Sequence, residues 1–96
     1  FAAFSSAKFG LRALAQSMAR ELGPKNIHVA HLIIDSGVDT AFVRDRIKDQ
    51  GEDPDSLAAN TLMEPKSIAD NYWMLHHQSR DAWTHEMDVR PFAEKF

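Results

Sequence analysis

Ile27-His28-Val29-Ala30-His31-Leu32-Ile33-Ile34 is rich in β-branched residues and almost continuously apolar. This composition is typical of a strand that is covered on both faces within a parallel sheet. Asp35-Ser36-Gly37 follows and predicts that the strand ends in a loop. The segment therefore indicates an α/β protein.

A long amphipathic helix is predicted before this strand, from Ala2 to Leu22, because apolar residues recur there every three or four positions. Gly23 and Pro24 then predict a left-handed cap and a stop. A second stripe on another face of the helix fits either a second subunit or the core of the parent domain. The first stripe is Phe4, Ala7, Leu11, Leu14, Ala15, Met18 and Leu22, and the second is Phe9, Ala13 and Ser17.

A short helix is predicted after the strand, with Thr40 as its cap. Its apolar residues are Phe42, Val43 and Ile47. Residues 48–60 are polar and contain Gly51 among acidic residues, which predicts a mobile connection of the kind that forms lids.

A second long helix is predicted to begin at Glu64-Pro65-Lys66-Ser67 and to continue to His76, since proline is tolerated in a first helical turn. Alternation over residues 83–89 predicts a final strand that Pro91 ends. The order helix, strand, short helix, helix, strand is that of the C-terminal part of a doubly wound, Rossmann-like parallel sheet. Two strands alone do not make a stable sheet, so we expect residues 1–96 to be a single incomplete domain.

Composition limits the classes of partner. The formal net charge of −3 argues against nucleic acid or an anionic membrane, because both attract clustered Lys and Arg. The absence of cysteine fits a reducing cytoplasm. No apolar run reaches the roughly 20 residues that cross a bilayer, so we expect a soluble cytoplasmic protein. Phe1 lies inside a predicted helix, which suggests a piece of a longer chain.

One set of residues, taken together, forms a specific sequence pattern. It consists of Phe4-Ser5-Ser6-Ala7-Lys8, Leu11, Leu14, Ser17, Ala19, Arg20-Glu21-Leu22-Gly23-Pro24 and Ile27. It resembles the active-site helix and following strand of the short-chain dehydrogenase/reductase family, and the resemblance extends to residues 83–91. The resemblance implies the C-terminal third of an oxidoreductase that uses NAD or NADP on a carbonyl or hydroxyl of a small molecule. It also implies a homo-oligomer. The glycine-rich turn, catalytic serine and helix asparagine of the family would lie upstream.

The resemblance assigns a cofactor role to Lys8. The family has Tyr-x-x-x-Lys at this place, where the tyrosine exchanges a proton with the carbonyl while the lysine bonds the ribose hydroxyls and lowers the pKa of the tyrosine. Phe4 stands in the tyrosine position and has no proton to exchange. Ser5 and Ser6 lie about 100° and 200° around the helix from Phe4, so neither naturally replaces the phenol. Tyr72 belongs to a different helix, and we expect it to be a core or interface aromatic. A substrate hydroxyl or water remains as another source of the proton.

The family's Pro-Gly-x-Val-x-Thr loop contacts the nicotinamide carboxamide and the phosphates, and it corresponds here to Asp35-Ser36-Gly37-Val38-Asp39-Thr40. Val38 and Thr40 match and are expected to bind the cofactor. Asp35 adds a negative charge beside an anionic cofactor, which should weaken binding unless a partner neutralises that charge. Val89-Arg90-Pro91 also departs from the family's paired glycine.

These departures leave two hypotheses. The first is an NAD(P)-dependent oxidoreductase with a relocated or weak proton donor. The second is a catalytically impaired protein of the same fold that serves as a cofactor-sensing or oligomerisation scaffold.

Other candidate sites have simpler interpretations. His28 and His31 fall on opposite faces of a strand, and His76 and His77 point about 100° apart on a helix, so we expect no metal site. The acidic run at residues 52–55 lacks the pattern of a calcium loop. The two tryptophans, Trp73 and Trp83, are expected to pack against neighbouring residues.

Overall fold

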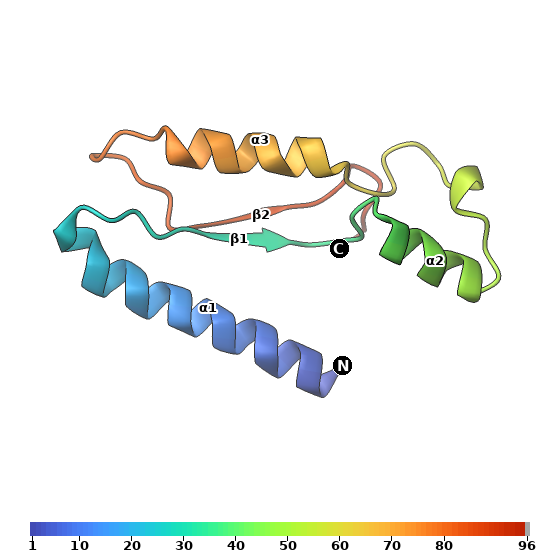
Figure 1. The fold of residues 1–96 in the computed structure, drawn as a ribbon, viewed down its shortest axis with the longest axis horizontal. Helices are drawn as coiled ribbons and strands as arrows, with labels where there is room; N and C mark the ends of the chain where they lie inside the picture. The colour runs from blue at the N-terminus through green and yellow to red at the C-terminus, as the bar shows by residue number, and fades with distance from the viewer. Residues whose placement is uncertain (96) are drawn as a thin grey trace. The chain divides into compact units, whose positions relative to one another are not determined.

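The computed structural model describes residues 1–95 and shows an α/β arrangement of three α-helices and a sheet of two parallel strands (Figure 1). The elements in chain order are α1 (Ala2–Leu22), the 3-10 turn η1 (Gly23–Lys25), β1 (His31–Ile34), α2 (Ala41–Asp49), the 3-10 turn η2 (Pro54–Ser56), α3 (Pro65–His76) and β2 (Glu86–Val89). Among the described residues, no helix combines the length and apolar character needed to cross a membrane.

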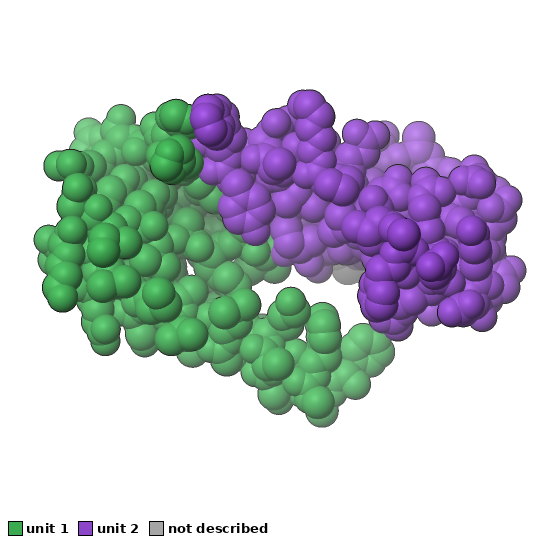
Figure 2. Space-filling view, in the orientation of Figure 1, with its two compact units in different colours: residues 1–33, 74–87 green, residues 34–73, 88–96 purple. Residues whose placement is uncertain are grey.

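The chain divides into two compact units (Figure 2). Unit 1 consists of Phe1–Ile33 and Met74–Met87, and unit 2 consists of Ile34–Trp73 and the residues from Asp88 onward. Unit 1 therefore contains α1 and η1, whereas unit 2 contains α2 and η2. Each unit is described by itself below.

Both strands are shorter than the sequence predicts. The backbone N–H of His31 donates to the carbonyl of His85 at 2.7 Å, and β1 begins there and not at Ile27. Upstream of that bond, the contact between the two segments uses a side chain, since His28 Nε2 lies 2.7 Å from the carbonyl oxygen of Thr84. The β-branched composition of residues 27–34 predicts a longer strand than the structure has, because backbone pairing with the second segment begins only at His31.

Most helix boundaries in the structure agree with those predicted from the sequence. Thr40 caps α2 as predicted, with the backbone N–H of Val43 donating to its Oγ1 at 3.3 Å. The left-handed cap predicted at Gly23 is wrong, because Gly23 is right-handed (φ −53°, ψ −49°) and begins η1. Asn26 is the left-handed residue (φ 67°), a conformation that asparagine tolerates. The predicted connection over residues 48–60 contains the end of α2 and the turn η2.

Few apolar side chains are buried within the described chain. Leu32, Met63 and Leu75 are the buried hydrophobic residues, and α1 contributes none. The expected coverage of both faces of β1 is not found, because Ile34 is 37% exposed. Trp73, expected to pack, is 67% exposed. Exposed apolar surface on this scale is typical of a face that further protein covers.

Met63 offers a test of where unit 2 is held together. Its side chain is 7% exposed, and its backbone exchanges hydrogen bonds with Gly37 and Asp39. We expect Met63→Ala to lower the free energy of unfolding of the intact protein by about 2–5 kcal/mol, because the substitution leaves a cavity. Met74→Ala is the matched control, since Met74 is 43% exposed, and it should cost less than about 1 kcal/mol. Urea unfolding measures both, and equal losses would contradict this assignment of the core.

Candidate functional site

α1 places Phe4 and Lys8 one helical turn apart, so that the two side chains share a face. The Lys8 ammonium lies over the Phe4 ring, 5.5 Å from its centroid, which is within the range of a cation–π contact. Both side chains are exposed. The arrangement keeps a positive charge available to a ligand and offers no titratable hydroxyl beside it.

One turn further along α1, Arg12 ties the helix to β2 within unit 1. Its guanidinium bonds both carboxylate oxygens of Glu86, Nε to Oε1 at 2.6 Å and Nη2 to Oε2 at 2.7 Å. His31 Nδ1 lies 3.2 Å from the same Oε1. The hydrogen bond from Arg12, and after it that from His31, holds the pKa of Glu86 below its usual range. This pair links α1, the helix that carries Lys8, to β2.

A small cavity of about 360 Å³ lies beside this ion pair, also within unit 1. It is lined by Phe9, Arg12, Ala13, Gln16, His85 and Glu86. His85 Nδ1 is buried without a hydrogen-bond partner. No sequence motif points to Arg12, and Glu86 is marked in the sequence by its place among the polar positions of a predicted strand.

In unit 2, the segment predicted to contact the cofactor is held by the backbone. Val38 forms a parallel bridge with Met63, and the Asp39 N–H donates to the Met63 carbonyl at 2.7 Å. Thr40 is exposed, and its hydroxyl oxygen accepts the bond that caps α2. A threonine hydroxyl that accepts a bond still has its own proton to donate.

The negative charge of Asp35 has a partner in the same unit. Arg90 Nη2 lies 2.9 Å from Asp35 Oδ2 and 3.5 Å from a carboxylate oxygen of Asp88. Asp35 and Arg90 are two of the positions where the sequence departs from the pattern that it resembles. The sequence predicts that Asp35 needs a neutralising partner if an anionic cofactor is to bind beside it. Arg90 is such a partner.

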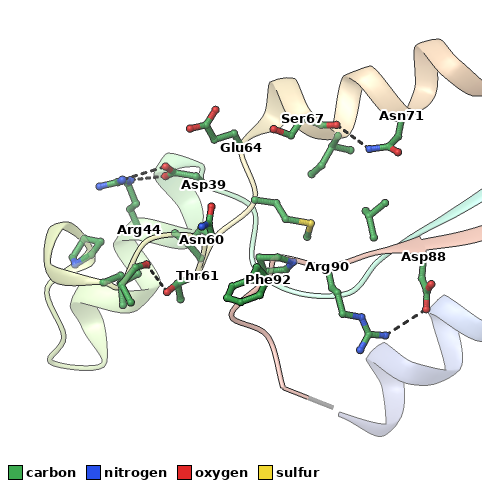
Figure 3. Close-up of a pocket in the computed structure, with 18 of the residues that line it drawn as sticks. Asp39, Arg44, Asn60, Thr61, Glu64, Ser67, Asn71, Asp88, Arg90 and Phe92 are labelled. Atoms are coloured by element: carbon green, nitrogen blue, oxygen red, sulfur yellow. Dashed lines mark hydrogen bonds and ion pairs between the residues drawn. The ribbon is translucent and has the colours of Figure 1, made fainter.

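Unit 2 also contains a cavity of about 900 Å³ that is open to solvent, shown in Figure 3. Apolar side chains such as Met63, Val89 and Phe92 line it together with polar and charged ones. Its two arginines are paired with carboxylates. Figure 3 shows Arg90 with Asp88 and Arg44 with Asp39, and Arg90 also pairs with Asp35. The cavity is thus lined by both apolar and polar side chains, and each arginine that lines it is paired with a carboxylate.

The predicted site residues are divided between the units. Phe4 and Lys8 belong to unit 1, while Val38 and Thr40 belong to unit 2 with Asp35. The structure brings Lys8 together with Phe4, and it brings Thr40 into the segment that contains Val38 and Asp35. The cofactor assignments of Lys8, Val38 and Thr40 stay predictions.

The histidines take part in ordinary packing and hydrogen bonding. His28 stacks on Trp83 with ring centroids 4.7 Å apart and planes 5° from parallel, which confirms the expected packing of Trp83. His76 and His77 meet edge to face at 5.1 Å. Over residues 1–95, no three metal-ligating side chains gather in one place.

Comparison with solved structures relates this arrangement to a known one. The chain is similar to the crystal structure of a short-chain dehydrogenase from Rhodopseudomonas palustris, with 49% sequence identity and a TM-score of 0.63. The alignment covers 96% of this chain and 31% of that chain, so the chain spans about a third of its length. No family model and no curated protein matches. The α/β arrangement of the chain matches part of the Rossmann-like fold of such enzymes.

The Arg12–Glu86 pair predicts a pH dependence of stability. Because folding lowers the pKa of Glu86, the ionised group stabilises the protein above its ordinary pKa of about 4.5, and that stability is lost as the pH falls. We expect Glu86→Gln to have a lower Tm than the wild type at pH 7 and to converge with it as the pH falls below the ordinary pKa of about 4.5.

Thermal unfolding of the intact protein between these pH values measures the effect. Glu21→Gln is the control, because Glu21 is an exposed carboxylate of α1 and should leave the profile unchanged. A Glu86→Gln profile parallel to that of the wild type would contradict the assignment.

Proposed function

We propose that this chain is part of an NAD(P)-dependent oxidoreductase of the short-chain dehydrogenase type that acts on a carbonyl or hydroxyl group of a small molecule. The observation that supports this most strongly is the 49% identity to a short-chain dehydrogenase along 96% of the chain. In this proposal Lys8 binds the ribose hydroxyls, and Val38 and Thr40 contact the nicotinamide side of the cofactor.

The chemistry of these residues fits such a cofactor. Lys8 is exposed and positively charged, so it can donate hydrogen bonds to ribose hydroxyls. Thr40 retains a proton that can be donated to an anionic or carbonyl oxygen. Arg90 offsets part of the charge of Asp35, which weakens the main electrostatic objection to an anionic ligand near this loop. When bound, the cofactor supplies a hydride acceptor or donor.

The proton in this proposal has a separate source. Reduction of a carbonyl adds a hydride to carbon and a proton to oxygen, and Phe4 cannot provide the proton. Lys8 then binds and orients the cofactor, while the proton comes from a group elsewhere in the protein, from water or from the substrate. Proton transfer by a positioned side chain typically contributes about 10²–10⁴ in rate, so an enzyme without it is expected to be slow.

A second function, a cofactor-sensing or oligomerisation scaffold, is favoured by two observations. Phe4 and Asp35-Ser36 replace residues that the catalytic pattern contains. α1 also carries exposed apolar side chains, among them Phe9 at 64% and Leu14 at 56%, as expected of a helix that contacts further protein. In either case we propose a homo-oligomer.

The role of Lys8 can be tested by cofactor affinity. We expect Lys8→Met to weaken NADH or NADPH binding to the intact protein by about tenfold or more, since a charge-assisted hydrogen bond is lost. Isothermal titration calorimetry measures the dissociation constant. Lys25→Met is the matched control, because Lys25 is exposed and lies in η1, beyond the C-terminal end of α1. If the wild type binds neither nucleotide, only the oligomerisation scaffold survives.

Phe4→Tyr tests whether the missing phenol limits catalysis. The substitution restores a proton donor one turn from Lys8, and we expect turnover of a carbonyl panel, followed by NADH or NADPH oxidation, to rise by about 10²-fold or more. Phe9→Tyr adds the same hydroxyl at another exposed aromatic position of α1 and should change nothing. Unchanged turnover in Phe4→Tyr, together with measurable cofactor binding, would favour the sensing scaffold.

A further inference from the structure

Asp35 and Arg90, both in unit 2, each follow the last residue of a strand. Because β1 and β2 are parallel neighbours, their carboxyl ends lie at the same edge of the sheet. The backbone N–H of Asp35 donates to the carbonyl of Val89 at 2.9 Å. The register of the two strands therefore brings Arg90 beside Asp35, at the edge where open α/β sheets bind their ligands.

Two side-chain contacts join the segment after β1 to the segment after β2. Arg90 Nη2 lies 2.9 Å from Asp35 Oδ2, and the Ser36 hydroxyl donates to Glu94 Oε2 at 2.6 Å. Asp35 and Ser36 stand where the resembled pattern has proline and glycine. A proline would restrict the backbone there by its ring. In this chain, contacts from residues 90–94 hold the same two positions by their side chains.

Residues 90–94 are themselves anchored within unit 2. Pro91 is buried. The N–H of Ala93 donates to the carbonyl of Asn60 at 3.2 Å, and the N–H of Glu94 donates to the carbonyl of Pro91 at 3.0 Å. The segment after β2 is therefore a turn with neighbours of its own, and it gives the loop after β1 a support that does not depend on that loop.

Arg90 is shared between two carboxylates. The same Nη2 that faces Asp35 at 2.9 Å lies 3.5 Å from Asp88 Oδ2 (Figure 3). The Arg90 side chain is 22% exposed, against 50% for Asp35. Two carboxylates and one guanidinium leave one net negative charge at this edge. Without Arg90, the two like charges would face each other with nothing between them to offset either.

The loop that is proposed to contact the cofactor starts at this point. Val38 and Thr40 follow Asp35 in the same segment, and a nicotinamide cofactor carries negative phosphates. A carboxylate beside the loop opposes the binding of an anion, and a guanidinium that faces the carboxylate reduces that opposition. Charge complementarity of this kind decides which ligand is accepted. The balance between Asp35 and Arg90 therefore affects how tightly an anionic ligand binds here.

We propose that Arg90 is a positioning residue that holds and neutralises Asp35, and that it thereby sets the affinity of the loop at residues 35–40 for the anionic cofactor. The inference rests on the proposed function, because it requires a cofactor beside that loop. Arg90 acts through Asp35 and does not need to touch the cofactor. Asp35 without Arg90 opposes binding, whereas replacement of Asp35 makes Arg90 dispensable.

Calorimetric titration of the intact protein with NADH and with NADPH tests these opposite signs. At low salt we expect Arg90→Gln to weaken binding about five- to tenfold and Asp35→Asn to bind at least as tightly as the wild type. In the Asp35→Asn background, Arg90→Gln should change the dissociation constant by less than about twofold. In about 1 M NaCl, where the Debye length is about 3 Å, the loss in Arg90→Gln alone should also shrink below about twofold.

Two further variants separate the charge of Arg90 from its shape and from charge in general. Arg90→Lys retains the cation and should bind like the wild type, since the contact with Asp35 uses a single nitrogen. Lys95→Gln is the matched control, because Lys95 is an exposed cation of the same terminal segment, and it should stay within about twofold of the wild type. Thermal unfolding without nucleotide shows whether each variant is folded.

Several results would overturn the proposal: equal binding in Arg90→Gln and the wild type, the same loss with and without Asp35, weaker binding in Asp35→Asn, or a loss that persists in high salt. If Arg90→Gln alone does not fold, Asp35→Asn and the double variant still decide, because both lack the unpaired carboxylate and should bind alike. A wild type that binds neither nucleotide ends the proposed function as well, whereas the results above end this inference alone.

Discussion

The parallel pairing of β1 with β2 is the constraint on which the other features depend. It is bounded by two backbone bonds, from His31 to His85 at 2.7 Å and from Asp35 to Val89 at 2.9 Å. Two strands do not form an independently stable sheet in water, and only Leu32, Met63 and Leu75 are buried hydrophobic residues among those described. Apolar burial within the described chain is therefore small, and polar contacts help to fix how the segments within each unit are arranged.

Three arginines supply these contacts, and each bridges segments that are distant in sequence or in secondary structure. Arg12 connects α1 with Glu86 of β2, Arg90 connects the end of β2 with Asp35 after β1, and Arg44 connects α2 with residues on either side of it. The planar guanidinium suits this role because it can hold two carboxylate oxygens at once. Because these pairs are partly exposed, they specify geometry more than they add stability.

The sequence predicts the local features of this fold better than the distant ones. The 3.6-residue period, together with the stop signal of Gly23 and Pro24, predicts α1, and the Thr40 cap is a contact between residues three positions apart. The strands were predicted too long because residue composition does not reveal where a partner strand begins. The partner of Asp35 could not be predicted, since Arg90 reaches it only through the register of β1 and β2. The roles of Lys8, Val38 and Thr40 rest on resemblance and stay predictions.

In the proposed function, Phe4 and Lys8 would separate cofactor binding from proton transfer within one helical turn. Binding a ribose requires a charge and hydrogen-bond donors, which Lys8 retains, and the Phe4 ring still lies beneath that charge at 5.5 Å. Proton transfer requires a titratable group, which a phenyl ring lacks. In this proposal, the phenyl ring at position 4 cannot carry out the proton step, while the Lys8 ammonium is still present to bind the ribose. An enzyme and a cofactor sensor built on this helix would differ only in whether a proton source is supplied from elsewhere.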